Sequence, residues 1–131
     1  SVKKTELPLR QTNTLSPLGE IYTALTLGLR DYVHKNGFKK VILGISGGID
    51  STLTALIAVD SIGKNNVTAL SMPSPYGSKE AIRDKRILAK NLGIKLRTVP
   101  ITEIFHKYLH ILKPHFQDKL WDTTEENIQA R

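Results

Sequence analysis

The sequence predicts an α/β domain built on a parallel sheet. Apolar runs of strand length alternate three times with apolar stripes at helical spacing. The first run, residues 41–45, is almost continuously apolar, which is typical of a strand covered on both faces. A glycine-rich loop then leads into the next helix, at the position where open α/β sheets bind ligands. These observations favour strand–helix–strand units with right-handed connections.

The first element is a helix expected over residues 17–35. Ser16 is a suitable N-cap and Pro17 suits the first helical position. Asn36 and Gly37 supply the stop. An apolar stripe makes this helix amphipathic: Leu18, Ile21, Leu25, Leu29 and Tyr32.

The elements after the loop follow from the same patterns. The helix over 52–62 carries Leu, Ile and Ala on most sides, which predicts that it is well buried. The last strand alternates apolar residues with Lys95 and Arg97, which places it near an edge. This last strand covers residues 94–99. Before it, a strand is expected over 67–72, followed by a helix that Ser78 caps and Gly93 ends. After it come a helix from Thr102 to near Pro114, an irregular stretch over 115–123 and a final helix capped by Thr124.

Composition limits the class of protein. The chain has 131 residues, the size of one domain, and 40% of them are hydrophobic, which is enough for a folded core. The absence of cysteine excludes disulfides and thiolate metal sites, and no apolar run is long enough to span a membrane. The formal net charge of +7 favours anionic ligands.

The domain is expected to be part of a larger one. Residues 1–16 are polar and contain Pro8, so they form a linker or arm ahead of a domain over 17–131. Three strands are half of a usual doubly wound sheet. We therefore expect an incomplete sheet, whose unpaired edge and uncovered face favour self-association.

The loop after the first strand carries the chemistry. Main-chain N–H groups and the positive dipole end of the following helix attract anions. Bare backbone at Gly47 and Gly48 lets phosphate oxygens approach, and two serine hydroxyls add donors. The loop lacks the Gly-Lys-Ser/Thr of a Walker loop and the Gly-x-Gly-x-x-Gly fingerprint. Its residues are Gly44, Ile45, Ser46, Gly47, Gly48, Ile49, Asp50 and Ser51.

Asp50 would repel phosphates unless a cation lies between them. A Mg²⁺ ion held by Asp50 and bridged to the phosphates removes the conflict, so this residue predicts a magnesium nucleotide. The alternative is an ordinary turn in which Asp50 or Ser51 caps the helix. Two serines, two glycines and an aspartate at the switch from strand to helix favour the nucleotide.

Residues 46–51 resemble the Ser-Gly-Gly-x-Asp-Ser loop of the N-type ATP pyrophosphatases. That superfamily includes GMP, asparagine and NAD⁺ synthetases and tRNA-modifying enzymes. Residues 29–38, 72–76 and 124–131 resemble the synthetase domain of glutamine-dependent NAD⁺ synthetases more specifically. The resemblance runs from about residue 17 to the end of the chain. It implies an adenine-nucleotide α-hydrolase-like (Rossmann-like) three-layer sandwich, here incomplete.

The resemblance also implies an activity. It is the ATP-dependent amidation of deamido-NAD to NAD⁺ through an adenylated intermediate, which releases AMP and pyrophosphate. Ammonia would come from glutamine through a glutaminase domain of the parent chain, and this chain alone would be inactive. ATP would lie on residues 44–51 and Met72, Mg²⁺ on Asp50, and deamido-NAD on Asn127 and Arg131. The implied setting is a cytoplasmic homodimer or larger homo-oligomer, with neither a membrane nor nucleic acid as partner.

Two alternatives stay open. One keeps the ATP chemistry but changes the acceptor, as in GMP synthetase-like or tRNA-modifying enzymes; the other is a non-catalytic adenine-nucleotide-binding module. His106 and His110 have the spacing of a zinc site, with His115 nearby, but solvated or packed histidines are favoured. The helix over 78–93 is interpreted as having a solvated basic face, ahead of a contact with nucleotide phosphate or RNA. Its basic residues are Lys79, Arg83, Lys85, Arg86 and Lys90.

Overall fold

The fold is that of a computed structural model, which describes residues 14–75, 77–115 and 127–128. The predicted alternation of strands and helices is confirmed. Most of the predicted arm, the irregular stretch after residue 115 and the Thr124 cap lie outside the described residues. The elements are α1 (Pro17–Lys35), β1 (Val41–Gly44), α2 (Ile49–Ile62), η1 (Lys64–Asn66), β2 (Val67–Ser71), α3 (Lys79–Leu92), β3 (Lys95–Thr98), α4 (Thr102–Leu112) and η2 (Lys113–His115).

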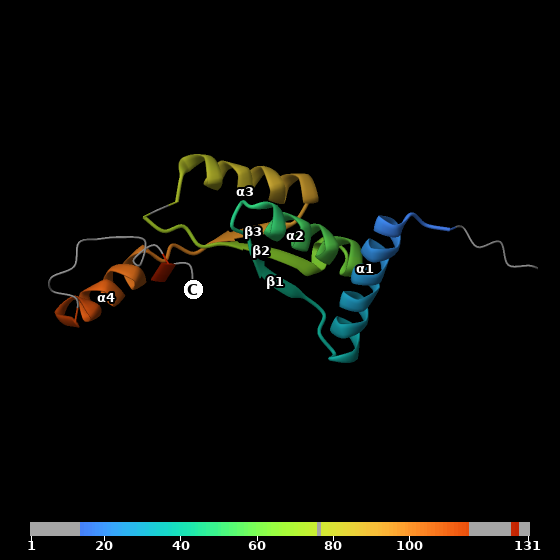
Figure 1. Ribbon diagram of the computed structural model, residues 1–131, viewed down its shortest axis with the longest axis horizontal. Coiled ribbons are helices and arrows are strands. Elements are labelled where there is room, and N and C mark those ends of the chain that lie inside the picture. Colours follow the sequence, from blue (N-terminus) through green and yellow to red (C-terminus); the bar gives the residue numbers. More distant parts are fainter. Residues whose placement is uncertain (1–13, 76, 116–126, 129–131) are drawn as a thin grey trace, which may run out of the picture.

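The three strands form one parallel sheet in the order β1–β2–β3 (Figure 1). Gly44 pairs with Leu70, and Leu70 pairs with Arg97. The carboxyl ends of the strands therefore lie together at one end of the sheet. The prediction that the last strand lies near an edge is confirmed for the part of the chain that the structure describes, where β3 pairs with β2 alone.

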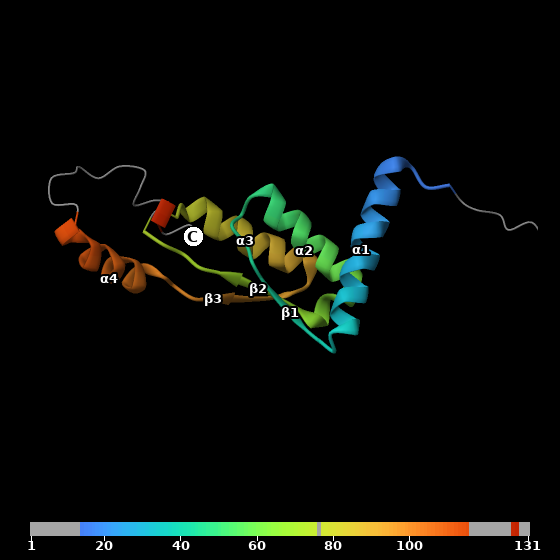
Figure 2. The ribbon, with the colours of Figure 1, turned by 60° about the horizontal axis from the view of Figure 1, so that its bottom comes forward.

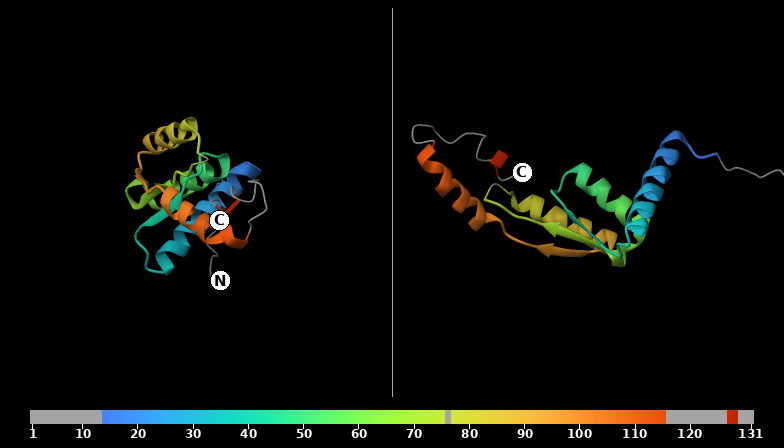
Figure 3. Two further views of the ribbon diagram at one scale, coloured as in Figure 1. Left: turned by 90° about the vertical axis from the view of Figure 1, so that its left-hand side faces the viewer. Right: turned by 90° about the horizontal axis from the view of Figure 1, so that it is seen from below.

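Helices α2 and α3 cover one face of the sheet (Figures 2 and 3). The connections β1–α2–β2 and β2–α3–β3 have the same handedness and step in the same direction across the sheet. Their helices therefore lie on the same face. Within the described residues the opposite face has no helix, so two of the three expected layers are present. The expectation that β1 is covered on both faces is therefore wrong: Ile42, which points to the bare face, is 62% exposed.

The core lies between the sheet and the two helices. Helix α2 contributes one face only, with Ala55, Ala58 and Ser61 buried and Leu53 and Leu56 exposed. The prediction that this helix is buried on most sides is wrong, because none of the described elements covers its outer face. The central cluster contains Ile45, Ala58, Val67, Ala69, Ala89 and Ile94.

Helix α1 packs beside α2 through both apolar and polar groups: Val33 is buried and Leu29 packs against the core cluster. The Tyr22 hydroxyl donates to the Asp60 carboxylate at 2.6 Å, and Arg30 Nε donates to the Ser61 carbonyl at 2.9 Å. The hydrogen bond to Asp60, followed by desolvation and the carboxylate charge, raises the pKa of Tyr22. The rest of the apolar stripe of α1 lies outside, and Leu18 is 79% exposed.

The termini of the helices follow the predicted capping pattern. Ser16 and Ser78 accept hydrogen bonds from main-chain N–H groups of α1 and α3, and Gly93 ends α3 in the left-handed conformation. Helix α4 extends beyond the carboxyl end of β3, away from α2 and α3 (Figure 1). No described helix combines the length and apolar character needed to cross a bilayer.

Candidate functional site

The predicted ligand loop lies at the carboxyl end of β1, between the sheet and α2. Ile45 extends the strand pairing, because its N–H donates to the Leu70 carbonyl at 2.9 Å and its side chain is buried. Helix α2 then begins at Ile49, three residues earlier than the predicted start at 52. The first turn of α2 therefore includes Asp50 and Ser51, so the whole second half of the motif lies on a helix N-terminus.

The two serines brace this loop. The Ser51 hydroxyl donates to the Gly48 carbonyl at 3.1 Å and accepts from the Ser46 N–H at 3.2 Å. The Ser46 hydroxyl lies 3.0 Å from the Ser51 hydroxyl and accepts from the Gly48 N–H at 3.1 Å. Because the Ser51 hydroxyl donates its proton to the Gly48 carbonyl, the Ser46 hydroxyl is the donor in the hydrogen bond between the two serines. Both side chains thus fix the loop conformation from within, a role that the sequence analysis did not predict.

The N-terminus of α2 has no side-chain cap among the described residues. Gly48 occupies the N-cap position, and neither Asp50 nor Ser51 makes the capping hydrogen bond that the alternative interpretation required. A helix without a cap presents first-turn N–H groups and the positive end of its dipole to an external partner. This arrangement suits an anion at the loop.

Gly47 is required by its backbone conformation. Its φ of +95° is strained for any residue with a side chain. A Cβ atom there would lie 3.6 Å from the Ala81 carbonyl oxygen and 3.7 Å from Lys85 Cε, both on α3. Helix α3 therefore packs directly on the loop and forms one of its walls.

Asp50 meets the requirements of a Mg²⁺ ligand in a nucleotide site. Its carboxylate is exposed at the start of α2 and forms no ion pair with any described residue. In the described part of the chain no three His, Cys, Asp or Glu side chains gather into a metal-binding group. A single carboxylate fits Mg²⁺ in particular, because this ion completes its shell with phosphate oxygens and water.

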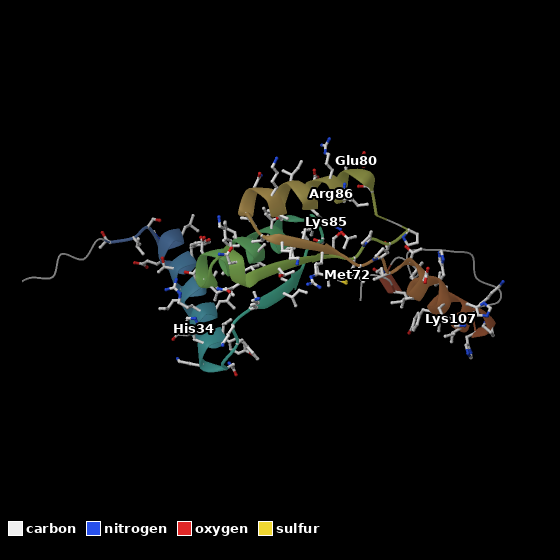
Figure 4. All side chains as sticks on the ribbon, turned by 180° about the vertical axis from the view of Figure 1, so that it is seen from behind. His34, Met72, Glu80, Lys85, Arg86 and Lys107 are labelled. Carbon is white, nitrogen blue, oxygen red and sulfur yellow. The ribbon has the colours of Figure 1, made fainter. Side chains whose placement is uncertain are left out.

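The structure describes some of the other predicted site residues and not all of them. Met72 follows β2, and its Cε lies 3.5 Å from the position of a Cβ on Gly44, so these two are brought together (Figure 4). Asn127 is exposed. The short described segment 127–128, drawn in red, lies on the side of the molecule where the strands end (Figures 1 and 2). Arg131 lies outside the described residues.

One prediction about the basic helix is wrong. Arg83, Arg86 and Lys90 are exposed, but Lys85 is only 9% exposed and lies beneath α3 (Figure 4). The signal was in the sequence, since Lys85 is four residues from both Ala81 and Ala89 and so shares their helix face. On α4, His106 and His110 are exposed.

Comparison with known proteins identifies the family. The family model for NAD synthase matches residues 21–131. The chain belongs to the NAD synthase family. It is 56% identical over 112 residues to a glutamine-dependent NAD(+) synthetase of Thermotoga maritima, covering 86% of this chain and 19% of the relative. It thus spans about a fifth of the length of such relatives.

Solved structures agree with this assignment. The glutamine-dependent NAD⁺ synthetase of Acinetobacter baumannii, solved with ADP, matches with a TM-score of 0.87 and 41% identity, over 93% of this chain and 23% of that one. An NMN synthetase of Francisella tularensis matches with a TM-score of 0.71 and 27% identity, over 89% of this chain and 46% of that one. The resemblance to NAD⁺ synthetases and the α/β fold are both confirmed.

Proposed function

We propose that this chain provides the ATP-binding part of a glutamine-dependent NAD⁺ synthetase. One observation carries the proposal: an uncapped helix N-terminus follows a braced Ser-Gly-Gly loop at the carboxyl end of β1. In a member of the NAD synthase family, that geometry fits the polyphosphate of ATP. The solved relative that holds ADP supports an adenine nucleotide as the ligand.

The proposed reaction amidates deamido-NAD. ATP adenylates the acceptor, ammonia derived from glutamine displaces AMP, and pyrophosphate is the other product. Such transfers depend on positioning and charge neutralisation more than on a protein nucleophile. Accordingly, the site needs N–H donors and cations, and we assign no nucleophile to this chain.

Each part of the loop has a role in this proposal. The N–H groups of Gly47 and of the first turn of α2 bind the pyrophosphate half of ATP, while the Gly48 N–H stays on the Ser46 hydroxyl and the serines hold the loop in shape. Met72, against Gly44, lies along the adenosine. Mg²⁺ on Asp50 supplies positive charge to the phosphates. Asn127 and Arg131 are proposed to contact deamido-NAD.

A segment exchange tests the function. The segment of the Acinetobacter baumannii synthetase that matches this chain is replaced by the chain, and NAD⁺ formation is measured with deamido-NAD, MgATP and either glutamine or ammonia. We expect turnover with both nitrogen sources and stoichiometric release of AMP and pyrophosphate. The unmodified synthetase is the positive control, and an exchange that also carries Asp50→Asn is the negative one.

The acceptor is decided in the same assay. Deamidated mononucleotide is offered beside deamido-NAD, because a related solved structure is an NMN synthetase. A folded exchange protein that amidates the mononucleotide and not deamido-NAD would refute the assigned acceptor. One that binds ATP but releases no pyrophosphate with any acceptor would favour the non-catalytic module.

A further inference from the structure

The face of the sheet opposite α2 and α3 is open among the described residues (Figure 3). Side chains alternate between the two faces of a strand, and Val67 and Ala69 of β2 belong to the core. The residues between them, and those in register with them on β1 and β3, therefore lie on the other face. This open face consists of two rows across the sheet, Ile42–Thr68–Lys95 and Gly44–Leu70–Arg97.

The open face differs in chemistry from one side to the other. Its β1 and β2 side is uncharged, and Ile42 there is 62% exposed. Its β3 side carries Lys95 and Arg97, which are both exposed and whose side chains form no ion pair or hydrogen bond with any described residue. None of the three strands contains an acidic residue. The face is thus apolar along one side and positively charged along the other.

The size and the charge of the open face indicate what can cover it. Parallel sheets are normally covered on both faces, because an exposed apolar face leaves hydrophobic surface in water. Adjacent strands lie about 4.8 Å apart, so three strands present a face about 10 Å wide, which matches the width of one helix. A helix placed there takes Lys95 and Arg97 partly out of water. Both cations then need carboxylate partners, since a buried unpaired charge is costly.

Charge argues against a second copy of this chain as the cover. The open face of a second copy would bring its own Lys95 and Arg97 to the interface, where they meet either like charges or apolar strands. Its strands offer no carboxylate, and each copy carries a formal net charge of +7. An amphipathic helix with an acidic flank satisfies both sides of the face.

We propose that the open face is the docking site of one amphipathic helix with an acidic flank, supplied by the remaining part of the parent synthetase. Its apolar side chains cover Ile42 and Leu70, and its carboxylates pair with Lys95 and Arg97. This chain spans about a fifth of the length of its glutamine-dependent relatives, so most of such a synthetase lies outside it. The inference rests on the proposed place of the chain in a longer synthetase and is independent of the nucleotide-binding loop.

Carbodiimide cross-linking tests the proposal without altering the open face. The protein used is the Acinetobacter baumannii synthetase that carries this chain in place of its own segment, the exchange protein. The reagent joins a lysine amine to a carboxylate only where the two are in contact, and mass spectrometry identifies the linked peptides. We expect Lys95 to be linked to an Asp or Glu outside this chain. The Lys35–Asp31 ion pair, at 3.1 Å, is the internal control. A protein in which that pair is linked and Lys95 is not would overturn the inference.

A charge reversal tests the acidic character of the partner. Arg97→Glu should lower the midpoint of thermal unfolding of the exchange protein by about 2 °C or more and leave that of the isolated chain unchanged, because the repelled carboxylates are present only in the former. Arg83→Glu, at an exposed position of α3, is the matched control and should change neither. If Arg97→Glu does not fold in the exchange protein, Arg97→Met removes the charge and should cause a smaller loss. A midpoint that neither Arg97 variant lowers would contradict an acidic partner.

Two further measurements separate the inference from its alternatives. In a mixture of ¹⁵N-labelled and unlabelled isolated chains, a link from Lys95 to the other isotopic form would identify a second copy as the cover and overturn the proposal. NAD⁺ formation by the exchange protein is measured in parallel. A Lys95 link in a folded exchange protein without turnover supports the docking site and counts against the proposed function. Turnover without that link overturns the docking site alone.

Discussion

The segment around β2 and the two outlying helices, α1 and α4, differ in how much of their apolar surface is buried. Around β2, side chains from α2, α3 and all three strands or their flanking residues bury one another. Helix α1 turns only Leu29 and Val33 inward and adds hydrogen bonds such as that of Tyr22 to Asp60, and α4 extends past the sheet with Ile104 71% exposed. The ligand loop belongs entirely to the first region. Nucleotide binding should therefore depend on the β2 region and be insensitive to the exposed faces of the outlying helices.

The largest effect is expected at the centre of the core. Val67→Ala removes buried methyl groups from β2 and should lower the free energy of unfolding by about 2 kcal/mol. Val99→Ala, the same change at a half-exposed position after β3, is the matched control and should cost well under that amount. Urea denaturation followed by circular dichroism measures both. Equal losses of unfolding free energy in the two variants would mean that position 67 is no better packed than position 99.

The next variant is expected to lower both the stability of the fold and the affinity for MgATP. Gly47→Ala forces a side chain into a backbone with φ of +95°, which should cost about 1–2 kcal/mol of folding free energy. It should also weaken MgATP binding, because relief of the strain moves the loop N–H groups. Gly28→Ala, in α1 with open space around it, is the control and should not destabilise the protein. If the Gly47→Ala protein is less stable but binds MgATP with unchanged affinity, the loop is not the binding site of the nucleotide.

A smaller loss is expected at the junction of α1 and α2. Tyr22→Phe removes the hydrogen bond to Asp60, and about 0.5 kcal/mol of stability should go with it at neutral pH. Folding raises the pKa of Tyr22 above 10.0, so this contribution is complete below pH 10 and is lost as the pH rises through the raised value. Denaturation of both proteins at pH 7 and at increasing alkaline pH should show the gap closing. A gap that widens with pH would show that the hydrogen bond is not its source.

The smallest effect is expected on the exposed stripe of α1. Leu18→Ala should change the free energy of unfolding by less than about 0.5 kcal/mol, because this side chain is mostly in solvent already. MgATP affinity should not change. If chemical denaturation shows a loss of more than about 1 kcal/mol in the free energy of unfolding, the stripe is covered in solution, and α1 is buried more like the β2 region.

The parts of the molecule that the sequence predicted are those determined locally. Ser16, Ser78 and Gly93 act on main-chain groups within a few residues of themselves, so the helix ends they set were predictable. The position of the ligand loop was predictable for the same reason. The bare face at Ile42 was not, because an apolar strand residue is compatible with either a covered or an uncovered face.

The burial of Lys85 shows a different limit of prediction from sequence. Lys85 was grouped with its basic neighbours by charge, whereas its spacing from Ala81 and Ala89 put it on the inner face. Periodicity was the better guide here, because helix geometry fixes the face regardless of residue type. The bracing hydrogen bonds of Ser46 and Ser51 could not be predicted, since they depend on the turn that brings the two hydroxyls within 3.0 Å.

The proposed function requires that the loop and Asp50 together bind a magnesium nucleotide. Titration of the wild type and of Asp50→Asn with ATP, each with and without Mg²⁺, tests it most directly. The wild type should bind ATP more tightly when Mg²⁺ is present, and Asp50→Asn should lose that enhancement while it still binds ATP without the metal. An enhancement by Mg²⁺ that survives unchanged in Asp50→Asn would contradict the account.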